Sequence, residues 1–334
     1  MKIKSTAQIF KTLADRVGCE INLEPSYELA GQILFPDSRK FYFKSTSLDI
    51  NSHGASEVAK DKGYTRFFME GMGYKIPHGS AFFSDYWCGV NEASNNSEAA
   101  LKFAGTLGYP VIVKPNSGSK GRDVFKAYNK EELREILKIV FENNNVVLIE
   151  EYIAGADYRL VVLNNEVMMA YQRLPLAVVG DGIDNIATLF DKKKTKLQNM
   201  GRKIPIEISD ERIGSRLNNF HKIDINYIPK VGEEVVLLDN ANLSSGGEAV
   251  DVTQSIHESY KNIAVKLTKD MGLHLAGVDF ITTDDITKTL QNPVFIEINS
   301  SPGLAHYQTL SPESASRVED LYYKILLELK NRAF

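Results

Sequence analysis

The segment 294–303 constrains the fold of this chain more than any other stretch of its sequence. It reads VFIEINSSPG, so that Glu297 and Asn299 alternate with apolar residues just before a Pro-Gly break. Side chains at positions i and i+2 of a strand project from the same face of a sheet, about 6.5–7 Å apart. The pattern therefore predicts a strand with two oxygen-bearing side chains on one face. The apolar residues expected on the opposite face are Val294, Ile296 and Ile298.

Asp279 occupies a similar position in the stretch AGVDFI, which is close enough in sequence to pair with the strand that carries Glu297 and Asn299. Three hard oxygen donors on one sheet face suit Mg²⁺, which prefers carboxylate and amide oxygens and fills its other positions with phosphate and water. A carboxylate pair without a cation would repel and raise its own pKa values. The sequence thus predicts a magnesium site, with a carboxylate satisfied by a lysine or a backbone N–H as the alternative.

A cation site of this kind requires a polyphosphate, and the stretch VIVKPNSGSKG offers a place for one. Lys114 ends a short apolar strand and is followed by the loop 116–121. Gly118 and Gly121 allow the backbone to approach an anion closely, so that N–H groups can cradle phosphate oxygens. Lys120 adds positive charge. The alternative is a solvated strand end, because the sequence contains neither G-x-x-x-x-G-K-[ST] nor G-x-G-x-x-G.

Two further groups of donors lie between these segments. Asn164-Asn165 predicts a tight hairpin turn, and Arg159 and Arg173 lie on its two arms. Two fork-shaped guanidinium groups on one hairpin can clamp a phosphate or a carboxylate, although for each arginine alone a surface ion pair is the favoured interpretation. A second glycine cluster, NANLSSGGEAVD, contributes Asn242.

Composition narrows the class of protein. The 334 residues are 43% hydrophobic and 25% charged, which is enough for two or three packed units. A formal net charge of −4 argues against nucleic-acid binding. Cys19 and Cys88 do not make a disulfide framework and indicate reduced thiols in a cytoplasmic protein. No apolar run approaches the ~18–20 residues of a membrane span, so we expect no membrane contact.

The order of the predicted elements indicates an α+β protein with mostly antiparallel sheets. Hairpins lie among helices, whereas a doubly wound protein alternates single strands with helices. The stretch KEELREILKIVFE predicts a helix that begins at Asn129, and GQILF and KFYFKS predict two strands in an otherwise poorly legible segment 1–60. The polar stretch 185–230 is interpreted either as a cover over part of the molecule or as a solvated surface insertion.

The motifs, taken in order, resemble the ATP-grasp superfamily and within it the ATP-grasp portion of cyanophycin synthetase. The resemblance runs from about Asp61 to the C-terminus, through GYPVIVKPNSGSKGRDV, IEEYIAGADYRLVVL, NANLSSGGEAVDVT, AGVDFI and FIEINSSPG. It implies an ATP-grasp fold, in which a nucleotide is held between two α+β subdomains. The implied division is a short N-terminal region 1–60, a linking helix and strand 61–95, a lid subdomain 96–153, and a C-terminal subdomain 154–334 with the polar insertion 185–230.

The resemblance also implies ATP as the nucleotide and assigns residues to it. The lysines that reach its phosphates are Lys62 and Lys114. The lid loop over the phosphates comprises Ser117, Gly118, Ser119, Lys120 and Gly121. The hinge that reads adenine through its backbone comprises Glu150, Glu151, Tyr152 and Ile153, and the acidic residue on the ribose hydroxyls is Asp157.

The remaining implied roles concern the metal and the reacting groups. Asp279, Glu297 and Asn299 match the magnesium ligands of the superfamily. Arg173 and Asn242 lie where its members hold the transferred phosphate and the acyl intermediate, and Arg159 is the further catalytic candidate.

The activity implied is an ATP-dependent carboxylate–amine ligase that forms an amide through an acylphosphate, on an amino-acid or peptide substrate. The alternatives are a D-alanine–D-alanine or glutathione-type dipeptide ligase, and an ATP-grasp kinase or nucleotide-binding regulator that forms no amide. The sequence lacks the Mur-ligase-like half of cyanophycin synthetase, so polymerisation would need that half or a partner protein. A homodimer is expected from the habit of the superfamily.

Overall fold

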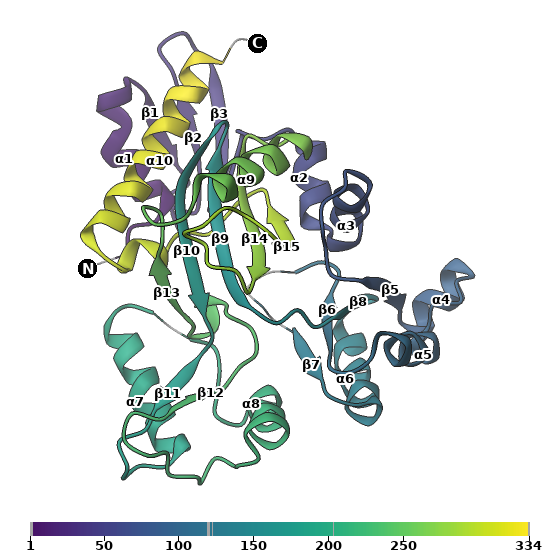
Figure 1. Cartoon of the computed structure of the whole chain (residues 1–334). Coiled ribbons are helices and arrows are strands. Elements are labelled where there is room, and N and C mark those ends of the chain that lie inside the picture. The colour runs from purple at the N-terminus through teal and green to yellow at the C-terminus, as the bar shows by residue number, and fades with distance from the viewer. Residues whose placement is uncertain (1–2, 119–120, 122, 203, 333–334) are drawn as a thin grey trace.

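The computed structural model describes residues 3–118, 121, 123–202 and 204–332. Figure 1 shows an upper body that holds both ends of the described chain and two lobes below it. We call the lower right lobe the lid and the lower left lobe the insertion lobe. Within the described residues, no helix is both long and apolar enough to cross a bilayer.

A five-stranded sheet forms the centre of the body, with strand order β13-β10-β9-β14-β15. Its strands are β9 (Ala156–Leu163), β10 (Glu166–Leu174), β13 (Glu248–Asp251), β14 (Leu275–Thr282) and β15 (Val294–Asn299). The turn between β9 and β10 falls at Asn164, which has a φ of 53°, as the sequence predicts. All strand pairs within the described part of the chain are antiparallel, which confirms the predicted α+β class.

The two faces of this core sheet are covered differently. Helix α9 (Glu258–Asp270) packs on one face, where Leu160 and Phe280 are fully buried. On the other face, Val161 and Leu163 belong to a cluster with α1 (Thr6–Val17) and α10 (Pro312–Asn331). Each buried aliphatic side chain contributes about 1.5–3 kcal/mol. Because this second cover stops near Val161, the end of the face at residues 157–159 is left for polar side chains.

One prediction about β15 is wrong. Asp279 pairs with Glu297, but Phe280 pairs with Phe295, so β15 carries an extra residue at Ile296. A bulge sets two residues of one strand against one of its partner and shifts the alternation beyond it. Phe295 and Ile298 therefore pack together in the cluster under α9, and Val294 and Ile296 do not share that cluster with Ile298.

The described part of the segment 1–60 contains two helices and a second sheet with strand order β1-β2-β3-β4, and the first helix and this sheet pack beside α10. The elements are α1, β1 (Glu20–Leu23), β2 (Ala30–Leu34), β3 (Lys40–Lys44), β4 (Ser47–Leu48) and α2 (His53–Lys60). The two predicted strands correspond to β2 and β3. In β3, Phe41 and Phe43 are buried between exposed neighbours, and both join a cluster with Phe10 and Leu13 of α1. The next helix, α3 (Lys62–Gly71), leaves Phe67 exposed.

The lid contains a sheet with strand order β5-β8-β6-β7. Its elements are β5 (Gly79–Phe83), α4 (Asp85–Asn91), α5 (Ser97–Leu107), β6 (Val111–Pro115), β7 (Phe125–Ala127), α6 (Lys130–Asn143) and β8 (Val146–Glu151). Asn129 caps α6, as predicted, by accepting a hydrogen bond from Glu132 N. Helices α5 and α6 cover one face of the sheet. The other face carries Lys114, Lys126 and Glu150.

The insertion lobe has a hydrophobic cluster of its own. It comprises β11 (Ala177–Val179), α7 (Ile186–Asn199), α8 (Glu211–Arg216), a π-helical turn (Leu217–His221) and β12 (Glu234–Val236). Ile186, Phe190, Ile213 and Leu237 pack at its centre. The polar stretch 185–230 is therefore part of a folded lobe, because it supplies Ile186, Phe190 and Ile213 to this cluster.

We predict that Gly155→Ala destabilises the protein more than Gly201→Ala. Both glycines have positive φ, 145° and 79°, which alone costs an alanine about 1–2 kcal/mol. A Cβ at Gly155 would also lie 2.6 Å from Thr282 O, whereas a Cβ at Gly201 meets open space. The collision adds about 1–3 kcal/mol. Urea unfolding of both variants checks the order, and equal losses would contradict the collision.

Candidate functional site

Five charged side chains from four neighbouring strands share one end of the core sheet. Asp157 and Arg159 alternate onto the same face of β9. Across the sheet, Arg173 pairs in register with Asp157, Asp279 with Arg159, and Glu297 with Asp279. We call this set, together with the neighbouring amide of Asn299, the charged row. It begins where the cover of α1 and α10 ends, so the strand pairing itself brings together residues that lie far apart in sequence.

The charged row is held by guanidinium–carboxylate pairs. Arg159 donates from Nε to Asp279 Oδ1 at 2.6 Å and from Nη2 to Oδ2 at 2.5 Å. Arg173 donates to both oxygens of Asp157 at 2.7–2.9 Å, and its Nη1 lies 3.1 Å from Asp279 Oδ2. Burial acts to raise the pKa of Asp279, but the charges of Arg159 and Arg173 outweigh it and hold that pKa below its usual value. Asp279 is therefore an ionised carboxylate satisfied by two arginines.

Glu297 and Asn299 form the outer end of the row and are only partly buried. With its amide turned to satisfy both neighbours, Asn299 donates to Glu297 Oε1 at 2.9 Å and accepts from Arg159 Nη2 at 3.2 Å. Within the described residues, no three His, Cys, Asp or Glu side chains are grouped to hold a metal. A magnesium ion at this place would thus depend on Glu297 and the Asn299 amide oxygen. These donors fit the ion chemically, while both oxygens of Asp279 already accept hydrogen bonds.

A buried network behind the arginines was missed by the sequence analysis. Tyr171 lies opposite Arg159 in register and stacks on Tyr307, with ring centroids 5.0 Å apart. The Tyr307 hydroxyl donates to Asp251 Oδ2 at 2.6 Å, and Arg317 Nη1 donates to the same oxygen at 2.6 Å. This network ties α10 to the strands that hold the charged row. The one sequence signal for this network is that Tyr171 lies two residues before Arg173 and therefore shares its face of β10.

On the lid sheet, Lys114 is buried and bonded to a second predicted site residue. Its Nζ lies 2.6 Å from Glu150 Oε2, and Arg66 Nη1 donates to Glu150 Oε1 at 2.9 Å. Lys62, at the start of α3, donates instead to Gly118 O at 3.1 Å. The structure thus places Lys62 beside the glycine loop and Lys114 beside the hinge.

The hinge residues differ in whether their backbone groups are already hydrogen-bonded within the lid. Glu151 N donates to His78 O at 2.8 Å, and Glu151 Oε1 accepts from His78 N at 2.7 Å, so this residue is fixed within the lid. Tyr152 is 41% exposed, and Ile153 is partly buried. The ring of Tyr152 lies 3.6 Å from Lys126 Nζ, a buried ammonium that sequence reasoning missed. Burial lowers the pKa of Lys126, although Asp239 at 3.5 Å opposes the shift.

The described part of the glycine loop contacts the insertion lobe and the core. Gly121 O accepts from Arg212 Nη1 and from Asn240 Nδ2, each at 3.1 Å. A Cβ added to Gly121 would collide with the side chains of Asn240 and Asn242, so Asn242 lies directly against the loop. Ser117 and Gly118 are exposed. Ser119 and Lys120, which we predicted in the loop, lie outside the described residues.

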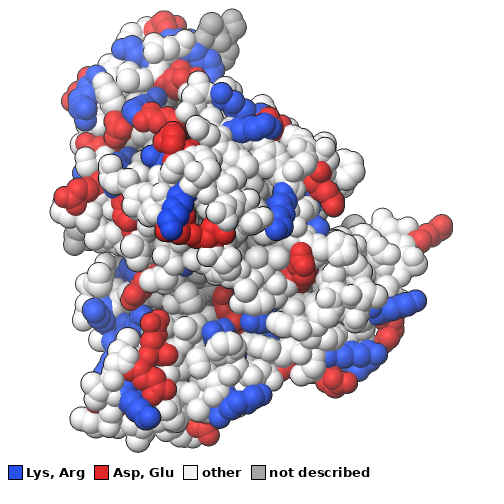
Figure 2. Space-filling model, in the orientation of Figure 1, with Lys and Arg blue, Asp and Glu red and all other residues white. Residues whose placement is uncertain are grey.

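The predicted site residues therefore fall into two groups. One group forms the charged row on the core sheet: Asp157, Arg159, Arg173, Asp279, Glu297 and Asn299. The other lies on the lid and its hinge, and Asn242 contacts the loop that belongs to the lid. On the molecular face in Figure 2, acidic and basic side chains are interspersed over the body and both lobes, and no broad basic patch is visible there.

Comparison with known proteins agrees with this architecture. Residues 85–215 match the family model described as "D-ala D-ala ligase C-terminus", and residues 239–319 match "RimK-like ATP-grasp domain". The chain is 28% identical over 311 residues to the glutathione biosynthesis bifunctional protein GshAB of Clostridium perfringens, covering 90% of the chain and 38% of that protein. It is 29% identical over 277 residues to the cyanophycin synthetase of Trichormus variabilis, covering 80% of the chain and 29% of that protein.

A solved structure shows the same fold. The crystal structure of a bifunctional glutathione synthetase from Pasteurella multocida aligns with 96% of this chain and 44% of its own, with a TM-score of 0.60 and 24% identity. The chain contains an ATP-grasp domain, as the motif order predicts. It spans less than half the length of these relatives.

We predict that Arg159→Met lowers the free energy of unfolding by on the order of 3 kcal/mol, because it leaves the buried Asp279 carboxylate with one arginine. The double variant Arg159→Met/Asp279→Asn loses less than the sum of its single variants. Lys138→Met is the control, because its pair with Glu135 is exposed and contributes about 0–1 kcal/mol. Urea unfolding gives the free energy of unfolding of the wild type and of all four variants. A loss for Arg159→Met no larger than that for Lys138→Met would refute the pairing.

Proposed function

We propose that the protein is an ATP-dependent carboxylate–amine ligase that forms an amide through an acylphosphate. The observation that carries this proposal is the charged row, which sets two guanidinium forks and an outer carboxylate on one sheet face. Such a face suits a reaction between a carboxylate and a triphosphate, both of which need positive forks and a divalent cation. Relatives named as a glutathione biosynthesis protein and a cyanophycin synthetase support the same class of reaction.

The chemistry explains why ATP is required. A carboxylate does not react with an amine at neutral pH, because its leaving group would be an oxide. Transfer of the γ-phosphoryl group to a carboxylate oxygen releases ADP and forms an acylphosphate. The amine then attacks the acyl carbon, the C–O bond to phosphate breaks, and the amine loses a proton, so amide and phosphate are the products. The protein supplies orientation and charge neutralisation.

Residue roles follow from the positions of the side chains. Arg173 and Arg159 would orient the acyl and phosphoryl oxygens, and Asn242 would meet them from beneath the glycine loop. Lys62 and Lys114 would neutralise the triphosphate. Mg²⁺ would be held by Glu297 and Asn299, with Asp279 as a further ligand once Arg159 or Arg173 releases one of its oxygens, and would supply positive charge that offsets the triphosphate.

The nucleotide base and sugar would lie at the hinge. Because Glu151 N is already bonded to His78 O, the backbone of Tyr152 and Ile153 is the better candidate for reading adenine. Asp157 would accept the ribose hydroxyls in addition to its bonds from Arg173. The glycine loop and the insertion lobe would exclude water from the acylphosphate.

The substrate proposed is an amino acid or a peptide end, as in a cyanophycin synthetase-like enzyme. A glutathione-type dipeptide ligase is the second candidate, because the similarity to the glutathione biosynthesis protein covers 90% of the chain. Magnesium, a cytoplasmic location and a homodimer stay predictions. A panel of amino acids and dipeptides, scored by phosphate release and product mass, tests the class. Phosphate release that depends on an added amine supports a ligase. ADP formation with a phosphorylated product and no free phosphate indicates a kinase, and phosphate release without an amine requirement indicates a regulator that hydrolyses ATP.

We predict that Glu297→Gln lowers phosphate release at least about 100-fold, because one charge of the proposed metal site is lost. The matched control is Glu166→Gln, an exposed residue at the opposite end of the same sheet that pairs with Lys324. Both variants are expected to retain wild-type melting temperatures. Wild-type turnover by Glu297→Gln in the presence of Mg²⁺ would exclude it from the site.

We also predict that Gly121→Ala raises the KM for ATP about tenfold or more. A methyl group at this position collides with Asn242, so the loop cannot lie against the core. Gly118→Ala is the control, because Gly118 also has positive φ but its Cβ would meet open space. Initial rates at varied ATP concentration give both KM values. Equal values for the two variants would show that the contact between Gly121 and Asn242 has no role in nucleotide binding.

A further inference from the structure

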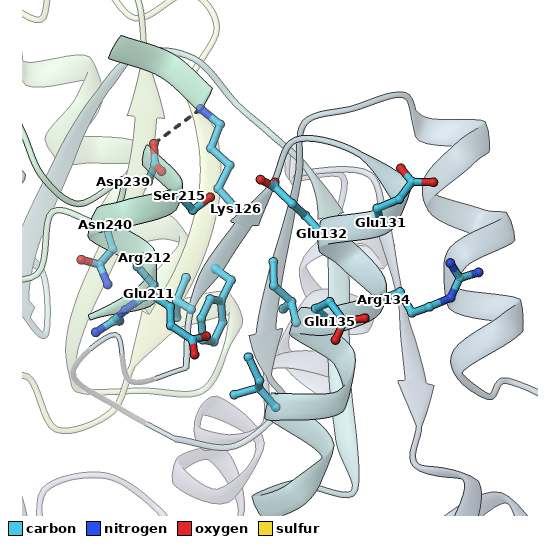
Figure 3. Close-up of a pocket in the computed structure, with 14 residues that line it drawn as sticks. Lys126, Glu131, Glu132, Arg134, Glu135, Glu211, Arg212, Ser215, Asp239 and Asn240 are labelled. Carbon is cyan, nitrogen blue, oxygen red and sulfur yellow. Dashed lines mark hydrogen bonds and ion pairs between the residues drawn. The ribbon is translucent and has the colours of Figure 1, made fainter. Parts of the chain in front are cut away.

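A cavity of about 460 Å³ lies outside the charged row, between the lid and the insertion lobe. Figure 3 shows it as a gap with Glu132 and Glu135 of α6 on one side and Glu211 and Arg212 of α8 on the other. Its volume falls within the range of about 300–1,000 Å³ that small-molecule pockets occupy, and its place between two lobes is typical of such pockets. Neither the motifs nor the proposed reaction uses it.

The floor of the cavity is apolar. Val124 and Phe125 contribute from the lid strand, and Ile136 and Ile139 contribute from α6. Phe125 is only partly buried, although it belongs to the edge of the hydrophobic cluster of the lid. A ligand with a flat apolar body would therefore cover side-chain surface that the protein itself leaves uncovered.

The walls of the cavity are acidic. Glu132 and Glu135 lie on the α6 side, and Glu211 lies on the α8 side. Two of the lining cations are already paired, since Lys126 bonds to Asp239 and Arg212 makes a two-pronged contact with Asp210.

The third lining cation, Arg134, does not change this balance, because it extends away from α8 in Figure 3. Within the described part of the chain, Glu211 forms no ion pair, and Glu135 pairs only with the exposed Lys138. A negative wall beside an apolar floor is complementary to a cation that carries an apolar body.

We propose that this cavity binds a small primary amine with an apolar or aromatic body, and that its occupation favours the closed position of the lid. The ammonium group pairs with Glu211 and the body lies on Phe125 and Ile139. The cavity has walls from both lobes, and two of its lining residues, Arg212 and Asn240, are those that hold Gly121 O. A ligand that touches both walls therefore stabilises the arrangement in which the glycine loop is held.

The binding test uses tryptamine as the probe in isothermal titration calorimetry with the full chain. Tryptophol, which replaces the ammonium by a hydroxyl, and indolepropionate, which carries a carboxylate, are the matched compounds. Tryptamine is expected to bind at one site, about fivefold or more tighter than tryptophol, with indolepropionate weakest. Equal binding of the three compounds would overturn the proposal.

Variants locate the site. Glu211→Gln is expected to weaken tryptamine binding about fivefold, whereas Glu142→Gln, an exposed position on α6 outside the cavity, leaves it unchanged. Ile139→Trp fills the cavity and should abolish binding without altering basal turnover. Glu211→Gln keeps the test decisive if Ile139→Trp fails to fold. Wild-type affinity in either Glu211→Gln or folded Ile139→Trp would overturn the assignment.

The test of coupling between tryptamine and the nucleotide rests on the proposed function, while the tests of tryptamine binding do not. Tryptamine is expected to lower the Kd of a non-hydrolysable ATP analogue. Thermodynamic reciprocity then requires the analogue to lower the Kd of tryptamine by the same factor. If tryptamine binds and the analogue does not bind at all, the proposed function fails and the cavity stands. If both bind without mutual effect, the link to the lid is refuted.

Discussion

A charge on the face of a buried sheet is stable only when an opposite charge and hydrogen bonds replace the water that it has lost. In this chain the fork between Arg159 and Asp279 meets that requirement, and Arg173 is shared between Asp279 and Asp157. Two arginines and two aspartates thus form one neutral set. Glu297 at its outer end adds a negative charge without adding a cation, which agrees with the proposal that a divalent ion binds beside it. The organisation of this end of the core sheet follows from the balance of charges.

The sequence was sufficient to find Asp279 and both arginines as site candidates, but not to show which of these side chains pair. Alternation around residues 279 and 297 identifies a polar face, because a strand has a period of two whatever its context. The pairing of Asp279 with Arg159 joins residues 120 positions apart, and that of Lys114 with Glu150 is equally invisible in any local window. The bulge at Ile296 was missed for the same reason, because it depends on the register with β14.

The insertion lobe shows a second limit of sequence patterns. The helix that begins at Asn129 was predictable, because one long stripe and one cap signal lie in a single window. In the insertion lobe, the apolar residues are spread thinly over α7, α8 and the flanking strands, so that each window reads as polar while the whole encloses a core. The contact of Lys126 with Asp239, which joins the lid to that lobe, likewise spans 113 positions.

The packing of α1 against α10 has a consequence for how the chain is made. The cluster that covers the upper half of the core sheet combines side chains from residues 7–50 with side chains from residues 304–329. Contacts of such wide sequence separation form late, since the entropy of closing the intervening chain must be overcome first. The sheet of the lid draws on residues 79–151 alone and can assemble on the ribosome while the rest is still being translated. Helix α10 is needed to complete the cover of the core sheet. A premature stop within that helix would therefore yield a folded lid attached to a body with an exposed apolar sheet face, which is prone to aggregate.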